Sequence, residues 1–186
     1  MKRNVYDFDG TIYDGDSTVD FHRFCRIRYP RVLLDLFGSG FYYLGMALGV
    51  CSKTRAKERF YRFLTFLPDV DGMVSAFWIK HEKNLKGWYL AQKTPEDLII
   101  SASPEFLLRP VCDKLGVRLI ASRVDKRTGA TAGLNCHDTE KVRRMRELYP
   151  DCQMQAFYSD SKADTPLAQL AERAYMVRGN TITPFF

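Results

Sequence analysis

The alternation of strand-like and helix-like segments along residues 97–186 constrains the fold more than any other feature of this chain. Short apolar runs of the kind that form buried strands occupy residues 98–100, 117–120, 156–158 and 174–177. One helix is expected to begin with Ser103 as its cap and Pro104 at its first position, and others to cover 138–148 and 165–172. Strands that alternate with helices of this length predict a parallel sheet in an α/β fold.

A further strand-like run, residues 2–9, stands far from the others along the sequence. Between it and residue 94 the pattern is helical, with helices expected at 17–29, 31–50, 52–67 and 70–92. Ser17 and Asp20 resemble a capping box at the start of the first of these helices. We therefore expect an α/β core made of 1–15 and 94–186, with 16–93 inserted as a helical domain. An insertion at this point lies over the carboxyl ends of the strands, where open α/β folds bind ligands.

Two carboxylates follow the N-terminal strand, in the run Asp7-Phe8-Asp9-Gly10-Thr11. Alternation along a strand turns Asp7 and Asp9 to the same side, with Phe8 opposite. Carboxylates this close repel each other unless a cation or a shared proton compensates. A divalent ion removes the repulsion, and oxygen ligands suit magnesium. Gly10 permits the backbone to approach a ligand closely at the turn.

A second acidic cluster, Asp160 and Asp164, follows the apolar run at 156–158. Asp160 would supply a further metal ligand at the end of that strand, and Asp164 would orient the loop and a metal-bound water. Acidic clusters that converge from different strands are costly without a cation, which favours a metal ion between them. Asp164 has a second interpretation, because Thr165-Pro166 is a typical helix start that Asp164 could cap.

Two further groups complete a site for phosphate. Ser101 ends the strand at 98–100 and offers a hydroxyl with backbone N–H groups nearby, among them that of Ala102. Lys141 lies near the start of the helix at 138–148, where the ammonium and the helix dipole both favour an anion. The alternative is that Lys141 is a solvated helix residue, since Lys162 also lies near the site by sequence.

These residues resemble the haloacid dehalogenase superfamily of phosphohydrolases. All four motifs of that superfamily occur in order, as Asp7-x-Asp9-Gly10-Thr11, Ser101 after a hydrophobic strand, Lys141, and Asp160-Ser161-x-x-Asp164. The inserted helices look like the C1-type cap of the phosphoserine-phosphatase-like branch, which implies a Rossmann-like parallel core beneath an all-helical cap. One departure is Ser159, where the family usually has glycine before the aspartate.

The resemblance implies a catalytic role for four residues. Asp7 attacks phosphorus and becomes the aspartyl phosphate. Asp9 protonates the leaving oxygen and then activates water for the second step. Ser101 and Lys141 bind and neutralise the phosphoryl oxygens. A carboxylate at the position of Asp9 is found in the phosphatases and phosphomutases of the family, whereas its ATPases have threonine there and its dehalogenases lack the second aspartate.

The resemblance also implies a cofactor and two backbone contributions to the site. Mg²⁺ is bound by Asp7, by the backbone carbonyl of Asp9 and by Asp160, with Asp164 supporting them from behind. Ala102 and Gly10 contribute to phosphate binding.

Charge and cysteine usage restrict the partners and the compartment. The formal net charge of +6 favours phosphorylated or otherwise anionic partners without choosing among them. Small basic clusters at 143–146 and 55–59 are interpreted as solvated helix faces, so no nucleic-acid partner is expected. The five cysteines include no C-x-x-C pair, which indicates a reduced, cytosolic chain, and no signal peptide is visible.

The apolar stretch 36–51 contains 16 residues without a charge, including Gly45-x-x-x-Gly49. It is short for a membrane span, which needs about 20 residues. The glycine spacing favours close helix packing within the cap or between two protomers. Contact with a lipid substrate or a membrane surface is the alternative. Monomer and homodimer both stay open.

We therefore predict a magnesium-dependent phosphatase that hydrolyses phosphomonoesters, either of a small metabolite or of a phospholipid. Three alternatives stay open at this point. The chain could transfer the phosphoryl group to an acceptor other than water, as a phosphomutase does. It could be a binding module of the same fold without catalysis. It could act on nucleic-acid ends, which would make binding weaken steeply with salt.

Overall fold

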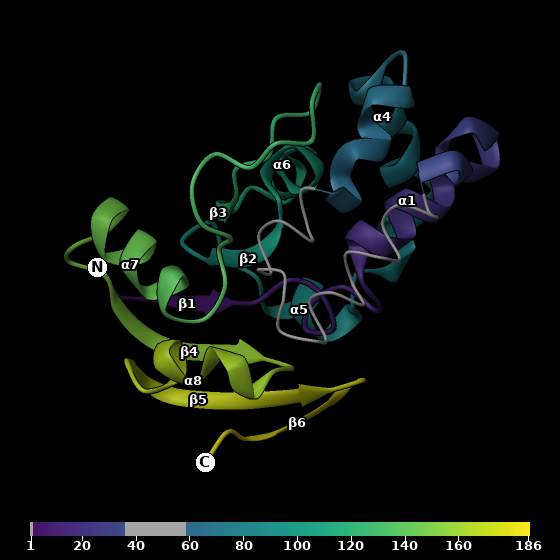
Figure 1. The fold of residues 1–186 in the computed structure, drawn as a ribbon. Helices are drawn as coiled ribbons and strands as arrows, with labels where there is room; N and C mark the ends of the chain where they lie inside the picture. Colours follow the sequence, from purple (N-terminus) through teal and green to yellow (C-terminus); the bar gives the residue numbers. More distant parts are fainter. Residues whose placement is uncertain (1, 36–58) are drawn as a thin grey trace.

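A computed structural model describes residues 2–35 and 59–186 (Figure 1). Its sheet has six strands in the order β3-β2-β1-β4-β5-β6. Every neighbouring pair is parallel except β5 and β6, which are antiparallel. The structure thus confirms the predicted α/β fold with a mainly parallel sheet. The strands are β1 (Lys2–Tyr6), β2 (Leu98–Pro104), β3 (Arg118–Ser122), β4 (Gln153–Ser159), β5 (Ala171–Arg178) and β6 (Thr181–Pro184).

Helices cover both faces of the sheet, because its central strands are apolar on both sides. Val5 and Ile100 belong to a buried cluster with residues of α7 (Thr139–Leu148) and α8 (Thr165–Ala168). Their chain neighbours Tyr6 and Ile99 belong to a second cluster, with residues of α6 (Glu105–Leu115). All four side chains are fully buried. Continuous apolar runs such as 98–100 are the sequence pattern of such two-sided strands.

Every element that the structure describes between β1 and β2 is helical. These helices extend the second buried cluster, which runs without a break from β1 into the insertion. Phe8 packs edge-on against Trp78, and the indole Nε1 of Trp78 donates a 2.7 Å hydrogen bond to the carbonyl of Leu107 in α6. The helical elements are α1 (Ser17–Arg28), η1 (Pro30–Asp35), η2 (Arg62–Phe66), α4 (Val70–His81), η3 (Glu82–Asn84) and α5 (Gly87–Gln92).

The single helix predicted over 70–92 is wrong, because the chain forms α4, η3 and α5 there. The break lies beside the turn that follows β1. The N–H of Lys86 donates to the carbonyl of Ile12 at 2.8 Å, and the N–H of Asp14 donates to the carbonyl of Asn84 at 2.8 Å. These backbone bonds replace helical ones, so the contact that ends the helix comes from a residue far away in sequence.

Two further elements near the C-terminus differ from the prediction. The helix expected over 165–172 ends at Ala168, because Ala171 already pairs with Met154 of β4 as the first residue of β5. Strand β6 was not predicted. It is short, exposed and contains Pro184, which is tolerated because the strand lies at the edge of the sheet.

Two helix starts also lie one residue from their predicted positions. Strand β2 continues through Ser103 to Pro104, and α6 begins at Glu105, so Ser103 is not a helix cap. Helix α7 begins at Thr139, because Asp138 has a φ of 56° and is therefore not helical.

The helices predicted at 31–50 and 52–67 lie largely outside the described residues, as does the apolar stretch 36–51. Within the described ranges, no helix has both the length and the apolar character needed to cross a bilayer.

Candidate active site

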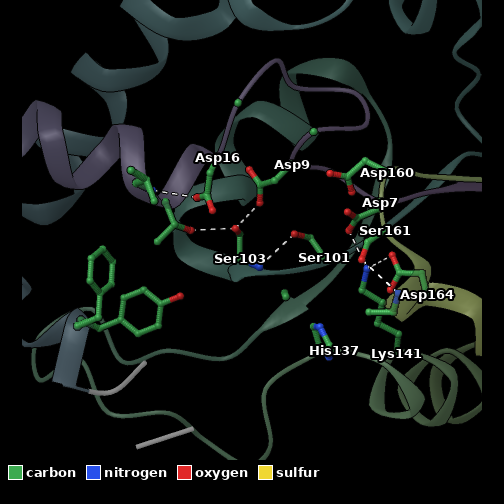
Figure 2. Close-up of a pocket in the computed structure, with 18 residues that line it drawn as sticks. Asp7, Asp9, Asp16, Ser101, Ser103, His137, Lys141, Asp160, Ser161 and Asp164 are labelled. Carbon is green, nitrogen blue, oxygen red and sulfur yellow. Dashed lines mark hydrogen bonds and ion pairs between the residues drawn. The ribbon is translucent and has the colours of Figure 1, made fainter. Parts of the chain in front are cut away.

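A cavity of about 500 Å³ opens where β1, β2 and β4 end, and Figure 2 shows acidic side chains around it. These strands are neighbours in the sheet, and the order of the strands reverses between β1 and β4. Open α/β sheets bind ligands at such a point. All eight residues that the sequence singled out for the site line this one cavity: Asp7, Asp9, Gly10, Ser101, Ala102, Lys141, Asp160 and Asp164.

Asp7 is the first residue after β1, which ends at Tyr6 and not at residue 9. Its backbone N–H donates to the carbonyl of Tyr158 at 2.9 Å, so the chain still follows β4 at this position. Its carboxylate Oδ1 accepts a 2.7 Å bond from the ammonium of Lys141. Burial raises the pKa of Asp7, and the charge of Lys141 acts in the opposite direction.

Lys141 is the buried cation of the site and is only 2% exposed. Its Nζ donates to Asp7 at 2.7 Å and to Asp164 at 2.8 Å (Figure 2). Burial lowers the pKa of Lys141, but these two carboxylates raise it by more, so it stays charged. Lys162 is exposed and does not line the cavity. Of the two lysines considered from the sequence, Lys141 is thus the one in the cavity.

Asp164 does not cap the following helix, although it precedes α8 directly. Its Oδ2 instead accepts bonds from Lys141 and, at 2.7 Å, from the hydroxyl of Ser159. Ser159 is fully buried and also accepts the N–H of Ser161 at 3.1 Å. The hydroxyl at the position where the family usually has glycine therefore fixes both the loop after β4 and the carboxylate behind Lys141. Sequence reasoning missed this role of Ser159.

Asp9 has a different environment from Asp7, although only Phe8 separates them in the chain. Its Oδ1 accepts a 2.6 Å bond from the N–H of Ser17, and its Oδ2 accepts a 2.5 Å bond from the hydroxyl of Ser103. Burial, followed by the charge of Asp16, raises the pKa of Asp9 to about 6, while the hydrogen bonds from both serines oppose the rise. A carboxyl with this pKa can both give and take a proton near neutral pH.

Gly10 gives the turn after Asp9 the room that it needs. Its φ is +69°, and a Cβ there would lie 2.1 Å from Oδ2 of Asp160. Its N–H donates to the carbonyl of Gly15, so this hydrogen bond stabilises the turn. Its carbonyl accepts a 2.5 Å bond from Nζ of Lys86, which also donates to the carbonyl of Gly179 at 2.7 Å. Lys86 is a second residue that sequence reasoning missed.

The donor set of the cavity fits a divalent ion that prefers oxygen ligands. Within the described ranges, no group of three or more His, Cys, Asp or Glu side chains surrounds one potential metal position. The expected set needs only the carboxylates of Asp7 and Asp160 together with the backbone carbonyl of Asp9. Burial raises the pKa of both carboxyl groups, so their ionised forms are disfavoured without a further positive charge. A divalent cation would supply the missing compensation.

The insertion closes one side of the cavity, where Thr18, Val19, Phe60 and Tyr61 contribute to the lining. Asp16 lines the cavity as well and caps α1, because its Oδ1 accepts the N–H of Val19 at 2.9 Å. Asp16 is therefore the N-cap of α1. The predicted capping role of Ser17 is wrong, because Ser17 is the first helical residue and its backbone N–H bonds to Asp9 instead.

Comparison with known proteins gives one family match and several relatives. The model of the family described as haloacid dehalogenase-like hydrolase matches residues 5–169. Protein CicA of Caulobacter vibrioides (strain NA1000 / CB15N) is 33% identical over 100 residues, which are 50% of this chain and 44% of CicA. The chain therefore matches less than half the length of that curated relative.

Two solved structures have a similar fold. A protein of unknown function from Bordetella pertussis Tohama I is 21% identical, with a TM-score of 0.76 over 93% of this chain and 88% of its own. A structure of phosphoserine phosphatase with a phospho-aspartyl intermediate analogue is 14% identical, with a TM-score of 0.52 over 94% of this chain and 86% of its own. At these identities the likeness concerns the fold alone.

Proposed function

Because the chain belongs to the haloacid dehalogenase-like hydrolases, as the match over residues 5–169 shows, we propose that it is a magnesium-dependent phosphatase of phosphomonoesters. The observation that carries the proposal is the pairing of two differently placed carboxylates in one cavity. Asp7 lies against the buried ammonium of Lys141, and Asp9 is bound by hydrogen-bond donors and has a pKa of about 6. Lys141 favours the ionised form of Asp7 that a nucleophile needs, against the burial that raises the pKa of this carboxyl. Asp9, which is bound by neutral donors, suits an acid and base.

In the first step, a carboxylate oxygen of Asp7 attacks phosphorus and the bond from phosphorus to the ester oxygen breaks. Asp9 gives its proton to the departing ester oxygen, which leaves as an alcohol. Lys141 and the N–H groups near Ser101 and Ala102 are close enough to the cavity to stabilise charge on the phosphoryl oxygens. The product of this step is an aspartyl phosphate on Asp7, the species whose analogue is present in the phosphoserine phosphatase structure of similar fold.

In the second step, water attacks phosphorus and the bond from phosphorus to Asp7 breaks. Asp9, now ionised, takes a proton from that water, so inorganic phosphate leaves and both carboxylates return to their starting states. One group can serve in both steps because its pKa of about 6 lies near neutral pH.

The carboxylates of Asp7 and Asp160 and the backbone carbonyl of Asp9 would bind Mg²⁺, with Asp164 supporting them through Lys141 and Ser159. When bound, the ion supplies positive charge against which the nucleophile and the phosphoryl oxygens can approach each other. The close approach of Asp160 to Gly10 supports this assignment, since any side chain at residue 10 would displace that carboxylate.

The substrate that we propose is a phosphorylated small molecule or the headgroup of a phospholipid. The cavity of about 500 Å³ is of the size that accepts a small ligand, and Phe60 and Tyr61 give it an aromatic side. We further propose that residues 16–93 form a cap over a core made of 1–15 and 94–186, which would shield the reaction from bulk water.

The test is a release assay for inorganic phosphate with purified protein, Mg²⁺ and a panel that contains small phosphorylated metabolites and phospholipid phosphates side by side. The matched control is Asp7→Asn, which replaces one carboxylate oxygen by an NH₂ group of nearly equal size. We expect at least one substrate to be hydrolysed, and the variant to lose that activity by on the order of 10⁴-fold. Absence of phosphate release from the whole panel, or full activity in the variant, would refute the proposal.

A further inference from the structure

A short chain of hydroxyl groups connects Asp9 to the inserted helices. The hydroxyl of Ser103, at the end of β2, lies 2.5 Å from Oδ2 of Asp9. The same hydroxyl lies 2.8 Å from Oγ1 of Thr18, in the first turn of α1. Ser103 is 5% exposed and all three residues line the cavity (Figure 2 labels Asp9 and Ser103). The core and the insertion therefore meet at the carboxylate that we assign as acid and base.

The direction of these hydrogen bonds follows from the number of protons. A serine hydroxyl has one proton and two acceptor sites. Ser103 gives its proton to Asp9, so it can only accept from Thr18. Thr18 thus orients the hydroxyl of Ser103, and Ser103 in turn orients one oxygen of Asp9. The other oxygen is fixed by the N–H of Ser17, also in α1.

We propose that Ser103 is a positioning residue for Asp9, and that Thr18 makes this positioning depend on α1. The inference rests on the proposed function, in which Asp9 protonates the leaving oxygen. With each carboxylate oxygen bound from a different element, rotation of the carboxyl about its terminal bond is restricted. The carboxyl group then keeps its proton directed at the ester oxygen, which is what efficient proton transfer requires.

A direct contact between Ser103 and the substrate phosphate is the competing explanation, since Ser103 lines the cavity. The two explanations differ in how they depend on the leaving group. An alcohol that is a poor leaving group needs a proton as it departs, whereas para-nitrophenolate departs without one. Loss of a phosphate contact affects both kinds of ester equally, because both contain the same phosphate.

The experiment compares kcat/KM of wild type and Ser103→Ala on phenyl phosphate and on para-nitrophenyl phosphate. The ratio kcat/KM reports the first irreversible step, in which the leaving group departs, and excludes the later hydrolysis of the phosphoenzyme. We expect Ser103→Ala to lose about tenfold more activity on phenyl phosphate than on para-nitrophenyl phosphate. This factor is smaller than the about 10²–10⁴-fold that a general acid contributes, because Asp9 itself is still present. Equal losses on the two esters would overturn the proposal.

Two further variants distinguish a positioning role of Ser103 from a general loss of structure. Thr18→Val keeps the shape of the side chain and removes the donor to Ser103. We therefore expect this variant also to lose more activity on phenyl phosphate than on para-nitrophenyl phosphate, but by a smaller factor. Ser122→Ala removes a buried hydroxyl at the end of the neighbouring strand β3, which bonds to the carbonyl of Ala102 at 2.9 Å and does not touch Asp9. We expect Ser122→Ala to change both esters by the same factor. A bias of equal size in Ser122→Ala would also overturn the proposal.

Failure of this inference is distinct from failure of the proposed function. If wild type hydrolyses neither ester nor any member of the metabolite and lipid panel, the proposed phosphatase activity itself is wrong. If wild type is active and Ser103→Ala shows no bias, the phosphatase assignment stands and only the role of Ser103 is removed.

Discussion

The two sides of the cavity are built in different ways. One side is ionic: Asp7, Lys141 and Asp164 form a buried cluster linked by bonds of 2.7 and 2.8 Å, and all three residues lie outside the inserted helices. We call it the ionic side. The other side contains Asp9, whose bonding partners are a serine hydroxyl from β2 and a backbone N–H from α1. We call it the hydroxyl side.

This difference shows how two aspartates separated by one residue can have separate tasks. The side chain of Asp7 contacts the full positive charge of Lys141, which favours its ionised form, but burial outweighs this charge and raises the pKa of Asp7. The side chain of Asp9 meets only dipoles in its hydrogen bonds, and burial moves its pKa upward to about 6. The bonding partners, an ammonium group for Asp7 and neutral donors for Asp9, distinguish the two carboxyl groups, whereas burial raises the pKa of both. Among the residues that the structure describes, the inserted helices bond directly to Asp9 on the hydroxyl side, through the N–H of Ser17.

The largest effect is expected from removing the charge on the ionic side. Lys141→Met keeps a long, unbranched side chain but leaves Asp7 and Asp164 without their shared cation. We expect kcat/KM to fall by about 10²–10³-fold, because a fixed charge that stabilises the transition state is lost. We also expect the free energy of unfolding to fall by about 3–5 kcal/mol, as when a buried ion pair loses one partner. Urea unfolding and steady-state kinetics measure the two effects.

The control for that variant is Lys162→Met, which removes an exposed lysine near the same loop. We expect it to change stability by less than about 0.5 kcal/mol. If Lys141→Met retained wild-type activity, or if Lys162→Met were equally damaging, the ionic side would not have the role given to it.

A second effect concerns Mg²⁺ and has a readout that does not need turnover. Mg²⁺ that binds the folded protein should raise its free energy of unfolding, by about 2.7 kcal/mol at a concentration of 100 times Kd. Asp160→Asn weakens the proposed set of ligands, so we expect this stabilisation to shift to higher Mg²⁺ concentrations. Thermal unfolding at a series of Mg²⁺ concentrations measures the shift. Asp113→Asn, on the exposed surface of α6, is the control and should respond to Mg²⁺ as wild type does.

The smallest effect tests whether the ion pairs of Glu140 in α7 serve stability alone. Hydrogen bonds from Arg143, opposed by burial and assisted by Arg144, lower the pKa of Glu140 to about 2. A lowered folded-state pKa stabilises the protein above the unfolded pKa of about 4.3, and this stability is lost as pH falls toward 2. The contribution at neutral pH is about 1–2 kcal/mol after allowance for screening, since Arg143 is largely exposed.

We therefore expect Glu140→Gln to be less stable than wild type at pH 7 and to lose less stability than wild type between pH 4.5 and pH 2. Unfolding curves recorded across that interval measure the difference. Its kcat/KM at pH 7 should stay within about twofold of wild type, because Glu140 does not line the cavity. A loss of activity as large as that of Lys141→Met would mean that Glu140 contributes to the site and not to stability alone.

Much of this site could be predicted because its chemistry lies at strand ends. Asp7 and Asp160 follow apolar runs directly, and parallel strands bring such ends together whatever the rest of the chain does. The order of the motifs along the chain also gave the family, which the match over 5–169 shows. Local pattern was sufficient wherever the position of a residue depends on its own strand.

Prediction was wrong where distant residues decide local structure. The helix over 70–92 ends early because Lys86 bonds to Ile12, and no signal in the sequence near residue 86 indicates that contact. Ser103 has the sequence of a helix cap, Ser-Pro-Glu, but β2 extends past it and directs its hydroxyl to Asp9. Ser159 departs from the glycine that is usual in the family, and the sequence does not indicate that its hydroxyl bonds to Asp164. Each of these roles depends on a partner that is remote in sequence.

The most direct measurement is the location of the covalent phosphoryl group. Asp9→Asn should still form the phosphoenzyme from para-nitrophenyl phosphate, whose leaving group needs no proton, but should hydrolyse it slowly. After an acid quench, digestion with trypsin releases residues 4–23 as one peptide that contains Asp7. We predict that mass spectrometry finds one phosphoryl group on this peptide, that fragmentation places it on Asp7, and that Asp7→Asn abolishes it. A phosphoryl group on another residue, or phosphate release by wild type with no phosphoryl group trapped on Asp7 in Asp9→Asn, would contradict the mechanism.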